Sequence, residues 1–173
     1  MSELRLPVLG FAARSGTGKT TLLIRLIPLL RACGLEIGMI KHAHHQFDID
    51  HPGKDSFELR RAGARQTLVA SDSRQALITE TIEISGPSLS SLVARLDPNL
   101  VDLILVEGFR HEPFPKIELH RAQLGKPLLS ASDPSIIAVA SDSAVATPLP
   151  LLPLNNPDVI AEFILGFCGK RSL

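Results

Sequence analysis

The chain has 173 residues, and its 18 Lys and Arg side chains balance its 18 Asp and Glu side chains, so the formal net charge is zero. A nucleic-acid-binding protein needs a basic excess or stripe, and a membrane protein needs an apolar run of about 18 residues, so we expect neither class. The length suits one domain over residues 1–173, and two distant cysteines, Cys33 and Cys168, predict reduced thiols in a cytoplasmic protein.

The first motif along the chain is a glycine-rich turn between an apolar run and a helical pattern. Residues 7–12 predict a buried strand, and leucines recur on one face of a helix expected over residues 19–32. The turn and first helical residues are Ser15, Gly16, Thr17, Gly18, Lys19, Thr20 and Thr21. A strand, a glycine-rich turn, Lys-Thr and a helix make up a phosphate-binding loop, in which backbone N–H groups cradle phosphates.

Each polar side chain of this loop has an expected task in nucleotide binding. Lys19 would reach the β- and γ-phosphates, the Thr20 hydroxyl would ligate Mg²⁺, and Thr21 would reach the α-phosphate. Ala13 stands where the motif usually has glycine, and alanine suits that position if its φ is negative. The alternative is a glycine-rich strand–helix turn with an exposed lysine.

A polar loop, residues 41–55, follows a strand expected over residues 36–41. It carries four histidines (His42, His44, His45 and His51) and three aspartates (Asp48, Asp50 and Asp55). Three interpretations are open: a Zn²⁺ or Ni²⁺ site, a switch-like loop, or a solvated loop. In the switch-like loop, Asp48 or Asp50 would hold Mg²⁺ through water and Lys41 or Lys54 would meet phosphate.

The next elements complete an alternation of strands and helices. Asp55 and Glu58 form a capping-box pattern for a helix over residues 56–62, and residues 66–70 and 75–80 predict an antiparallel hairpin. A helix follows over residues 88–96. The predicted fold is α/β and similar to phosphate-loop NTPases, with a mostly parallel twisted sheet, helices on both faces and a peripheral antiparallel hairpin.

A second motif is an apolar strand, residues 101–109, that contains an acid near its end. Glu107 would emerge beside the phosphate loop, where it can hold the Mg²⁺ shell or the attacking water. The alternative is a core strand with an exposed terminal acid. The remaining elements are strands over residues 115–119 and 136–140, an irregular stretch over 121–135, a proline-rich link over 148–153 and a helix over 158–167.

Asp142, just after the late strand, is the best candidate for the base-recognising acid. A carboxylate there would meet the N1 and N2 donors of guanine, and adenine offers no donors at that edge. The Asn-Lys pair that usually precedes such an aspartate is missing, so the sequence only suggests the choice of base.

Five segments together resemble the family of molybdopterin-guanine dinucleotide biosynthesis protein B, MobB. They are residues 15–21, Ile40-Lys41-His42, Pro52-Gly53-Lys54-Asp55-Ser56, Arg61-Ala62-Gly63-Ala64 and residues 103–109. The resemblance covers nearly the whole chain and implies a GTP-binding adaptor, at most a slow GTPase. It implies that residues 16–21 bind phosphates, that Thr20 and Glu107 serve Mg²⁺, and that residues 41–54 face the partner or the pterin. The implied partners are a MobA-type molybdopterin guanylyltransferase and a second copy of the chain, with molybdopterin as a further candidate.

Two other classes remain open at this stage. A small-molecule kinase could use Asp48 or Glu107 as the base and residues 110–121 as a lid. A metallochaperone GTPase could use His44 and His45. Only Arg14 lies where a local arginine finger would be, and the lack of an obvious one predicts slow hydrolysis.

Overall fold

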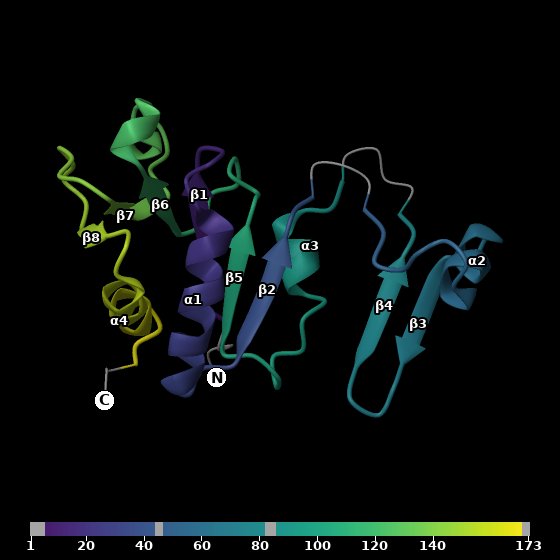
Figure 1. The fold of residues 1–173 in the computed structure, drawn as a ribbon. Coiled ribbons are helices and arrows are strands. Elements are labelled where there is room, and N and C mark those ends of the chain that lie inside the picture. The colour runs from purple at the N-terminus through teal and green to yellow at the C-terminus, as the bar shows by residue number, and fades with distance from the viewer. Residues whose placement is uncertain (1–5, 44–46, 82–85, 171–173) are drawn as a thin grey trace. The chain divides into compact units, whose positions relative to one another are not determined.

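The computed structural model describes residues 6–43, 47–81 and 86–170, which form two compact units (Figure 1). The first, here called the sheet unit, comprises residues 1–42 and 89–173. The second, here called the hairpin unit, comprises residues 43–88. The hairpin unit is therefore an insertion between a strand and a helix of the sheet unit. That both units belong to one domain stays a prediction.

The sheet unit is built on six strands, and every neighbouring pair runs parallel. The strands are β1 (Val8–Ala13), β2 (Ile37–Lys41), β5 (Leu103–Glu107), β6 (Lys116–His120), β7 (Ile136–Ser141) and β8 (Leu151–Pro153), in the spatial order β2-β5-β1-β6-β7-β8. The predicted parallel sheet is confirmed. Its central strand β1 leads directly into the glycine-rich turn predicted to bind phosphates, residues 14–18, here called the phosphate loop.

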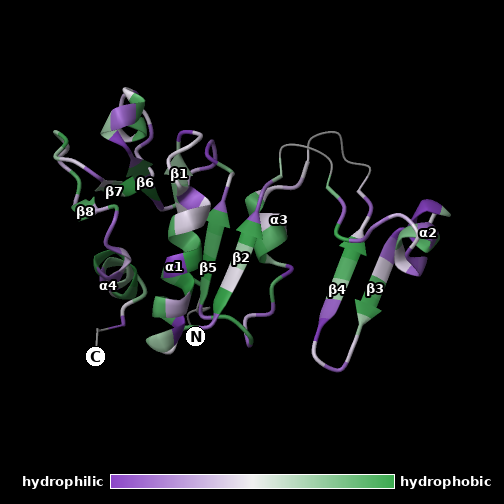
Figure 2. Cartoon of the chain, in the orientation of Figure 1, coloured by the Kyte–Doolittle hydropathy of each residue, from purple (hydrophilic) through white to green (hydrophobic). Residues whose placement is uncertain are grey.

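Strand β5 shows why the sheet is covered on both faces. Leu103 and Leu105 are fully buried in the core cluster that contains α1 (Lys19–Ala32) and α4 (Pro157–Phe167). Ile104 and Val106, which point the other way, join a second cluster with α3 (Leu89–Val93). Strands buried on both faces lose the polar–apolar alternation of surface strands, as Figure 2 shows for β5.

The two helices of the larger core begin and end with recognisable local signals. Helix α1 ends where predicted, because Gly34 has φ +77° and its N–H bonds the Arg31 carbonyl. Helix α4 begins with Pro157 behind Asn156, whose side-chain oxygen accepts from the Asp158 N–H at 3.2 Å. These helices pack side by side against the sheet (Figure 1).

A coil, residues 108–115, connects β5 to β6 where a helix would be usual. Phe114 of this coil packs on Gly10 of β1, where an added Cβ would lie 2.6 Å from the Phe114 ring. Gly10 therefore lets the coil lie against the strand next to the phosphate loop. The glycine is needed here for close approach rather than for a special φ angle.

Two charged side chains of β6 lie almost fully buried, with exposures of 1% for Lys116 and 2% for Glu118. Lys116 Nζ donates to the Glu112 carbonyl at 2.7 Å and pairs with Asp133 at 2.9 Å. The Glu118 carboxylate accepts from the N–H groups of Leu129 and Ser130 at 2.6 and 2.9 Å. Lys116 thereby satisfies a backbone carbonyl of the coil before β6, and Glu118 satisfies the first two N–H groups of the short 3₁₀ helix Leu129–Ala131, which have no partner within that helix.

The hairpin unit contains α2 (Asp55–Arg61), β3 (Gln66–Ala70) and β4 (Gln75–Thr79). Strands β3 and β4 form the predicted antiparallel hairpin, as a separate sheet. The capping prediction for α2 is wrong: Lys54 occupies the cap position without a side-chain bond, and Asp55 is already helical. Glu58 instead accepts from the Gly53 N–H at 3.3 Å.

The C-terminal third differs from the sequence-based expectation in two places. The link over residues 148–153 contains β8, and the irregular stretch contains two short 3₁₀ helices, Ala122–Leu124 and Leu129–Ala131. Both cysteines are free, as predicted. Among the described residues, no helix has the length and apolar character needed to cross a membrane.

Candidate functional site

The phosphate loop is closed by a short internal turn. Thr17, which is 2% exposed, donates its hydroxyl to the Arg14 carbonyl at 2.7 Å and its N–H to the same oxygen at 3.3 Å. Gly16 and Gly18 have φ angles of +81° and +95°, which side chains strongly disfavour. The two glycines are thus required by the backbone conformation as well as by access to a ligand.

The loop presents a cluster of backbone donors without acceptors. They are the N–H groups of Ser15, Gly16, Gly18, Lys19, Thr20 and Thr21, for which no residue in the described part of the chain supplies a hydrogen-bond acceptor. The last four open helix α1, where the helix dipole adds a partial positive charge. Such a group of free donors suits an anionic ligand, and binding of phosphates there stays a prediction.

Glu107 lies beside this loop, between two lysines. Its carboxylate is 3.7 Å from Lys19 Nζ and 3.8 Å from Lys41 Nζ, and its side chain is 17% exposed. Strand register explains the meeting, because Glu107 pairs with Phe11 of β1 on one side and with Lys41 of β2 on the other. The structure thereby brings Lys19 and Glu107 together as the sequence predicted.

Thr20 is an exposed residue of the first turn of α1. Its hydroxyl and the Glu107 carboxylate are hard oxygen donors of the kind that Mg²⁺ prefers, so the side chains present suit that ion. The role of this pair as ligands stays a prediction.

The backbone that leaves Glu107 is under steric constraint. Gly108 has φ +106°, and a Cβ added there would lie 2.5 Å from the Cβ of His42. Phe109 follows with φ +52°, the sole positive φ of a non-glycine residue in the described ranges, and its ring lies 4.8 Å from the His42 ring. Unfavourable backbone angles persist where surrounding structure enforces them, often at functional sites.

Asp142 lies just beyond β7, at the same edge of the sheet as the phosphate loop. Its two carboxylate oxygens accept from the Ala122 N–H at 3.1 Å and from Arg121 Nη1 at 3.3 Å. The bond from Ala122, together with the Arg121 charge, lowers the pKa of Asp142 below its ordinary value, although desolvation opposes the shift. Asp142 is therefore an ionised, oriented acceptor, as base recognition requires.

Arg121 was placed by the sequence only within a general lid segment. In the structure its Nε donates to the Thr17 carbonyl at 2.8 Å, so Arg121 contacts the phosphate loop itself. The signal that could have found it is its position directly after β6, since the carboxyl ends of parallel neighbours share one edge.

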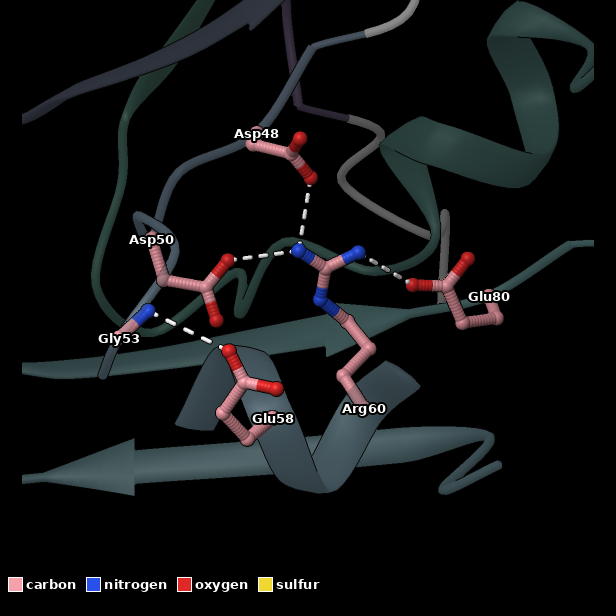
Figure 3. Close-up of polar contacts among 6 residues, drawn as sticks. All are labelled: Asp48, Asp50, Gly53, Glu58, Arg60 and Glu80. Atoms are coloured by element: carbon pink, nitrogen blue, oxygen red, sulfur yellow. Dashed lines mark hydrogen bonds and ion pairs between the residues drawn. The ribbon is translucent and has the colours of Figure 1, made fainter. Parts of the chain in front are cut away.

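The hairpin unit holds a second polar cluster around Arg60 (Figure 3). Its guanidinium bonds Asp48 and Asp50 at 2.7 Å each and Glu80 at 2.9 Å. These contacts raise the pKa of Arg60. Burial by itself raises the pKa of Asp50, but hydrogen bonds from Arg60 and Ser56 outweigh it and lower the pKa overall. Asp48 and Asp50 thus tie the polar loop to α2, and Arg60 also ties α2 to Glu80, the residue after β4.

The transition-metal interpretation of the polar loop gains no support from the described residues. They contain no group of three or more His, Cys, Asp or Glu side chains that could hold a metal ion. His44 and His45, on which that interpretation depends, lie outside the described residues.

Comparisons with known proteins agree over most of the chain. The family model MobB, molybdopterin guanine dinucleotide synthesis protein B, matches residues 8–142. A molybdopterin-guanine dinucleotide biosynthesis adapter protein of Escherichia coli (strain K12) is 49% identical over 96% of each chain. One from Haemophilus influenzae is 44% identical over 92% of this chain and 88% of that protein. A crystal structure of molybdopterin-guanine biosynthesis protein B (mobB) has a TM-score of 0.77 and 28% identity, covering 94% of this chain and 99% of that one.

Proposed function

The chain belongs to the MobB family, and we propose that it is an adaptor protein of molybdopterin guanine dinucleotide biosynthesis that binds GTP with Mg²⁺. The adaptor role is supported by the names of two relatives, each more than 40% identical over nearly their whole length. The nucleotide is supported by the chemistry of the site.

The free backbone donors of the phosphate loop carry the proposal. Six N–H groups without acceptors in the described structure, with the Lys19 ammonium beside them, call for a ligand that has several anionic oxygens. A nucleoside triphosphate provides them. Lys19 now pairs with Glu107, and a bound Mg²⁺ near Glu107 and Thr20 would take over the carboxylate and release the lysine to the phosphates.

Asp142 supports guanine over adenine. Its ionised carboxylate lies at the phosphate-loop edge, where guanine could present N1–H and N2–H and adenine has no matching donors. The parallel strand order places β7 two strands from β1, on the side opposite Glu107. Base and Mg²⁺ would thereby lie on opposite sides of the phosphates.

Any GTP hydrolysis by the isolated chain should be slow. An arginine finger contributes a rate factor of about 10³–10⁵. Arg121, which the structure places against the loop, already binds the Thr17 carbonyl and Asp142. Slow turnover suits an adaptor or carrier better than a metabolic enzyme.

A MobA-type molybdopterin guanylyltransferase is the proposed partner, with the chain acting as a homodimer. Leu68 and Leu77 face each other across the hairpin and are 62% and 58% exposed. Figure 2 shows hydrophobic stretches, in green, on both β3 and β4. A two-stranded sheet is marginally stable by itself, so an apolar face on it favours contact with a second copy. The polar loop over residues 41–54 is proposed to face the transferase or its pterin.

The test is calorimetric titration of GTP and ATP, each with Mg²⁺, into the wild-type protein, Lys19→Ala and the control Lys126→Ala. Lys126 is an exposed lysine outside the site. We expect GTP to bind more tightly than ATP, and binding to be lost in Lys19→Ala alone. GTP binding that survives Lys19→Ala would contradict the proposal.

These titrations, with added titrations of Ni²⁺ and Zn²⁺, address the two rival functions. A preference for ATP would favour a small-molecule kinase and direct the search to an acceptor hydroxyl. Stoichiometric Ni²⁺ or Zn²⁺ binding that disappears in His44→Ala/His45→Ala would favour a metallochaperone GTPase.

A further inference from the structure

A single guanidinium joins the ends of three strands of the sheet. Arg121 follows β6, and its nitrogens reach the phosphate loop after β1, Asp142 after β7 and Asn155 after β8. The three donor–acceptor distances are 2.8 Å to Thr17, 3.3 Å to Asp142 and 3.5 Å to Asn155. Only arginine offers several donors in one rigid plane, so the contacts are geometrically dependent on one another.

The contact with Thr17 fixes the orientation of one peptide in the phosphate loop. In a trans peptide the carbonyl and the following N–H point in opposite directions, and the described chain contains no cis bond. Because Arg121 holds the Thr17 carbonyl, the Gly18 N–H points away from Arg121. That N–H is one of the six free donors, so Arg121 keeps it available for a phosphate.

The contact with Asp142 leaves capacity for a base. An ionised carboxylate has about four acceptor positions, and Asp142 uses two of them, for Ala122 and Arg121. Two positions remain for the paired donors of guanine. The side chain is only 19% exposed, so its orientation is set by these protein contacts.

We propose that Arg121 is a positioning residue that couples recognition of the guanine base at Asp142 to phosphate binding at the Thr17–Gly18 peptide. A base that engages Asp142 holds the carboxylate, the carboxylate holds the guanidinium, and the guanidinium holds the loop in its binding conformation. Base and phosphates then bind cooperatively through one side chain. This inference rests on the proposed GTP binding.

The coupling makes a prediction that mere support of the loop does not. If Arg121 only supported the loop, Arg121→Ala would weaken GTP, ATP and tripolyphosphate by one common factor. Under the coupling, Arg121→Ala weakens GTP more than the other two, so the ratio of GTP to ATP affinity falls, by about tenfold if one charge-assisted hydrogen bond is lost.

The experiment measures dissociation constants of GTP, ATP and tripolyphosphate with Mg²⁺ for the wild-type protein, Arg121→Ala, Arg121→Lys, Asp142→Ala and Arg121→Ala/Asp142→Ala. Arg121→Lys keeps the charge but has one nitrogen, so we expect it to lose GTP preference as Arg121→Ala does. The double variant should lose less binding free energy for GTP than the sum of the losses in the two single variants. For tripolyphosphate, which has no base to engage Asp142, the departure from additivity should be smaller than for GTP. Circular dichroism of each variant checks that it is folded.

The outcomes separate this inference from the proposed function. Failure of the wild-type protein to bind any of the three ligands would refute the phosphate site itself. Equal binding of GTP and ATP, an unchanged GTP-to-ATP ratio in Arg121→Ala, or full rescue by Arg121→Lys would overturn the coupling while leaving the phosphate site in place.

Discussion

The buried lysine of β6 gives the sharpest stability prediction. Replacing Lys116 by Met keeps the length and apolar stem of the side chain but removes the ammonium. The Glu112 carbonyl then loses its 2.7 Å bond, and the Asp133 carboxylate loses a partner 2.9 Å away. Breaking a buried ion pair costs about 3–5 kcal/mol. Asp133 is 24% exposed and keeps its bond from the Ser135 N–H, so the expected cost is at the lower end, about 3 kcal/mol.

Urea unfolding followed by circular dichroism measures this cost, because the chain lacks Trp and Tyr for fluorescence. With a slope near 2 kcal/mol/M, a loss of about 3 kcal/mol lowers the midpoint by about 1.5 M. Lys126→Met makes the same chemical change at an exposed position and should stay within about 0.5 kcal/mol of wild type.

A second variant tests the reason for the loss. Asp133→Asn added to Lys116→Met removes the stranded charge and should recover part of the stability. The reasoning is refuted if Lys116→Met is as stable as Lys126→Met, or if the double variant is less stable than Lys116→Met.

Three further predictions concern packing, the hairpin unit and acid. Gly10→Ala should lower the free energy of unfolding by about 1–3 kcal/mol, because its Cβ would lie 2.6 Å from the Phe114 ring. Gly166→Ala, in open space within α4, should be neutral or stabilising in the same urea unfolding experiment, and equal effects of the two changes would refute the packing argument. Arg60→Met should speed amide exchange in β3 and β4, since three carboxylates lose their shared cation, whereas the exposed control Arg61→Met should not. Burial raises the pKa of Asp133, but bonds from Lys116 and Ser135 outweigh it and hold the pKa below 3.8. The stabilisation that the ionised Asp133 carboxylate contributes is therefore present above pH 3.8 and lost as pH falls through the lower pKa of the folded state. The difference in free energy of unfolding between wild type and Lys116→Met should accordingly become smaller in acid. A difference that does not change with pH would contradict this.

The phosphate loop and its strands could be predicted because their signals are local. Glycines at fixed spacing, Lys-Thr and a helical pattern all lie within one strand–turn–helix segment. Glu107 was predictable for a related reason: an apolar strand that ends in an acid delivers it to the same edge, and the pairing with Lys19 at 3.7 Å confirms the proximity.

The buried charges of β6 and the role of Arg121 could not be predicted in this way. Lys116 and Glu118 take partners in stretches that have no periodic sequence pattern: Glu112 lies in coil, and Leu129 and Ser130 lie in a short 3₁₀ helix. Arg121 contacts Thr17, which is 104 residues away along the chain. Such contacts follow from strand order, and strand order depends on the whole set of crossovers.

Proline content concealed β8 for a physical reason. Pro150 and Pro153 lack N–H groups, which normally argues against a strand. At the edge of the sheet, β8 needs partners on one side only, and the Pro150 carbonyl still accepts from the Val139 N–H at 2.9 Å. The capping prediction for α2 failed because Asp55 takes up helical angles itself, leaving Lys54 at the cap.

The central claim is that the free N–H groups of residues 15–21 receive the phosphates of a nucleotide. Amide NMR spectra of ¹⁵N-labelled protein, recorded with and without a hydrolysis-resistant GTP analogue and Mg²⁺, test it most directly. We expect the signals of Ser15, Gly16, Gly18, Lys19, Thr20 and Thr21 to shift together, and Lys19→Ala to abolish the shifts. Binding of the analogue without movement of these signals would contradict the account.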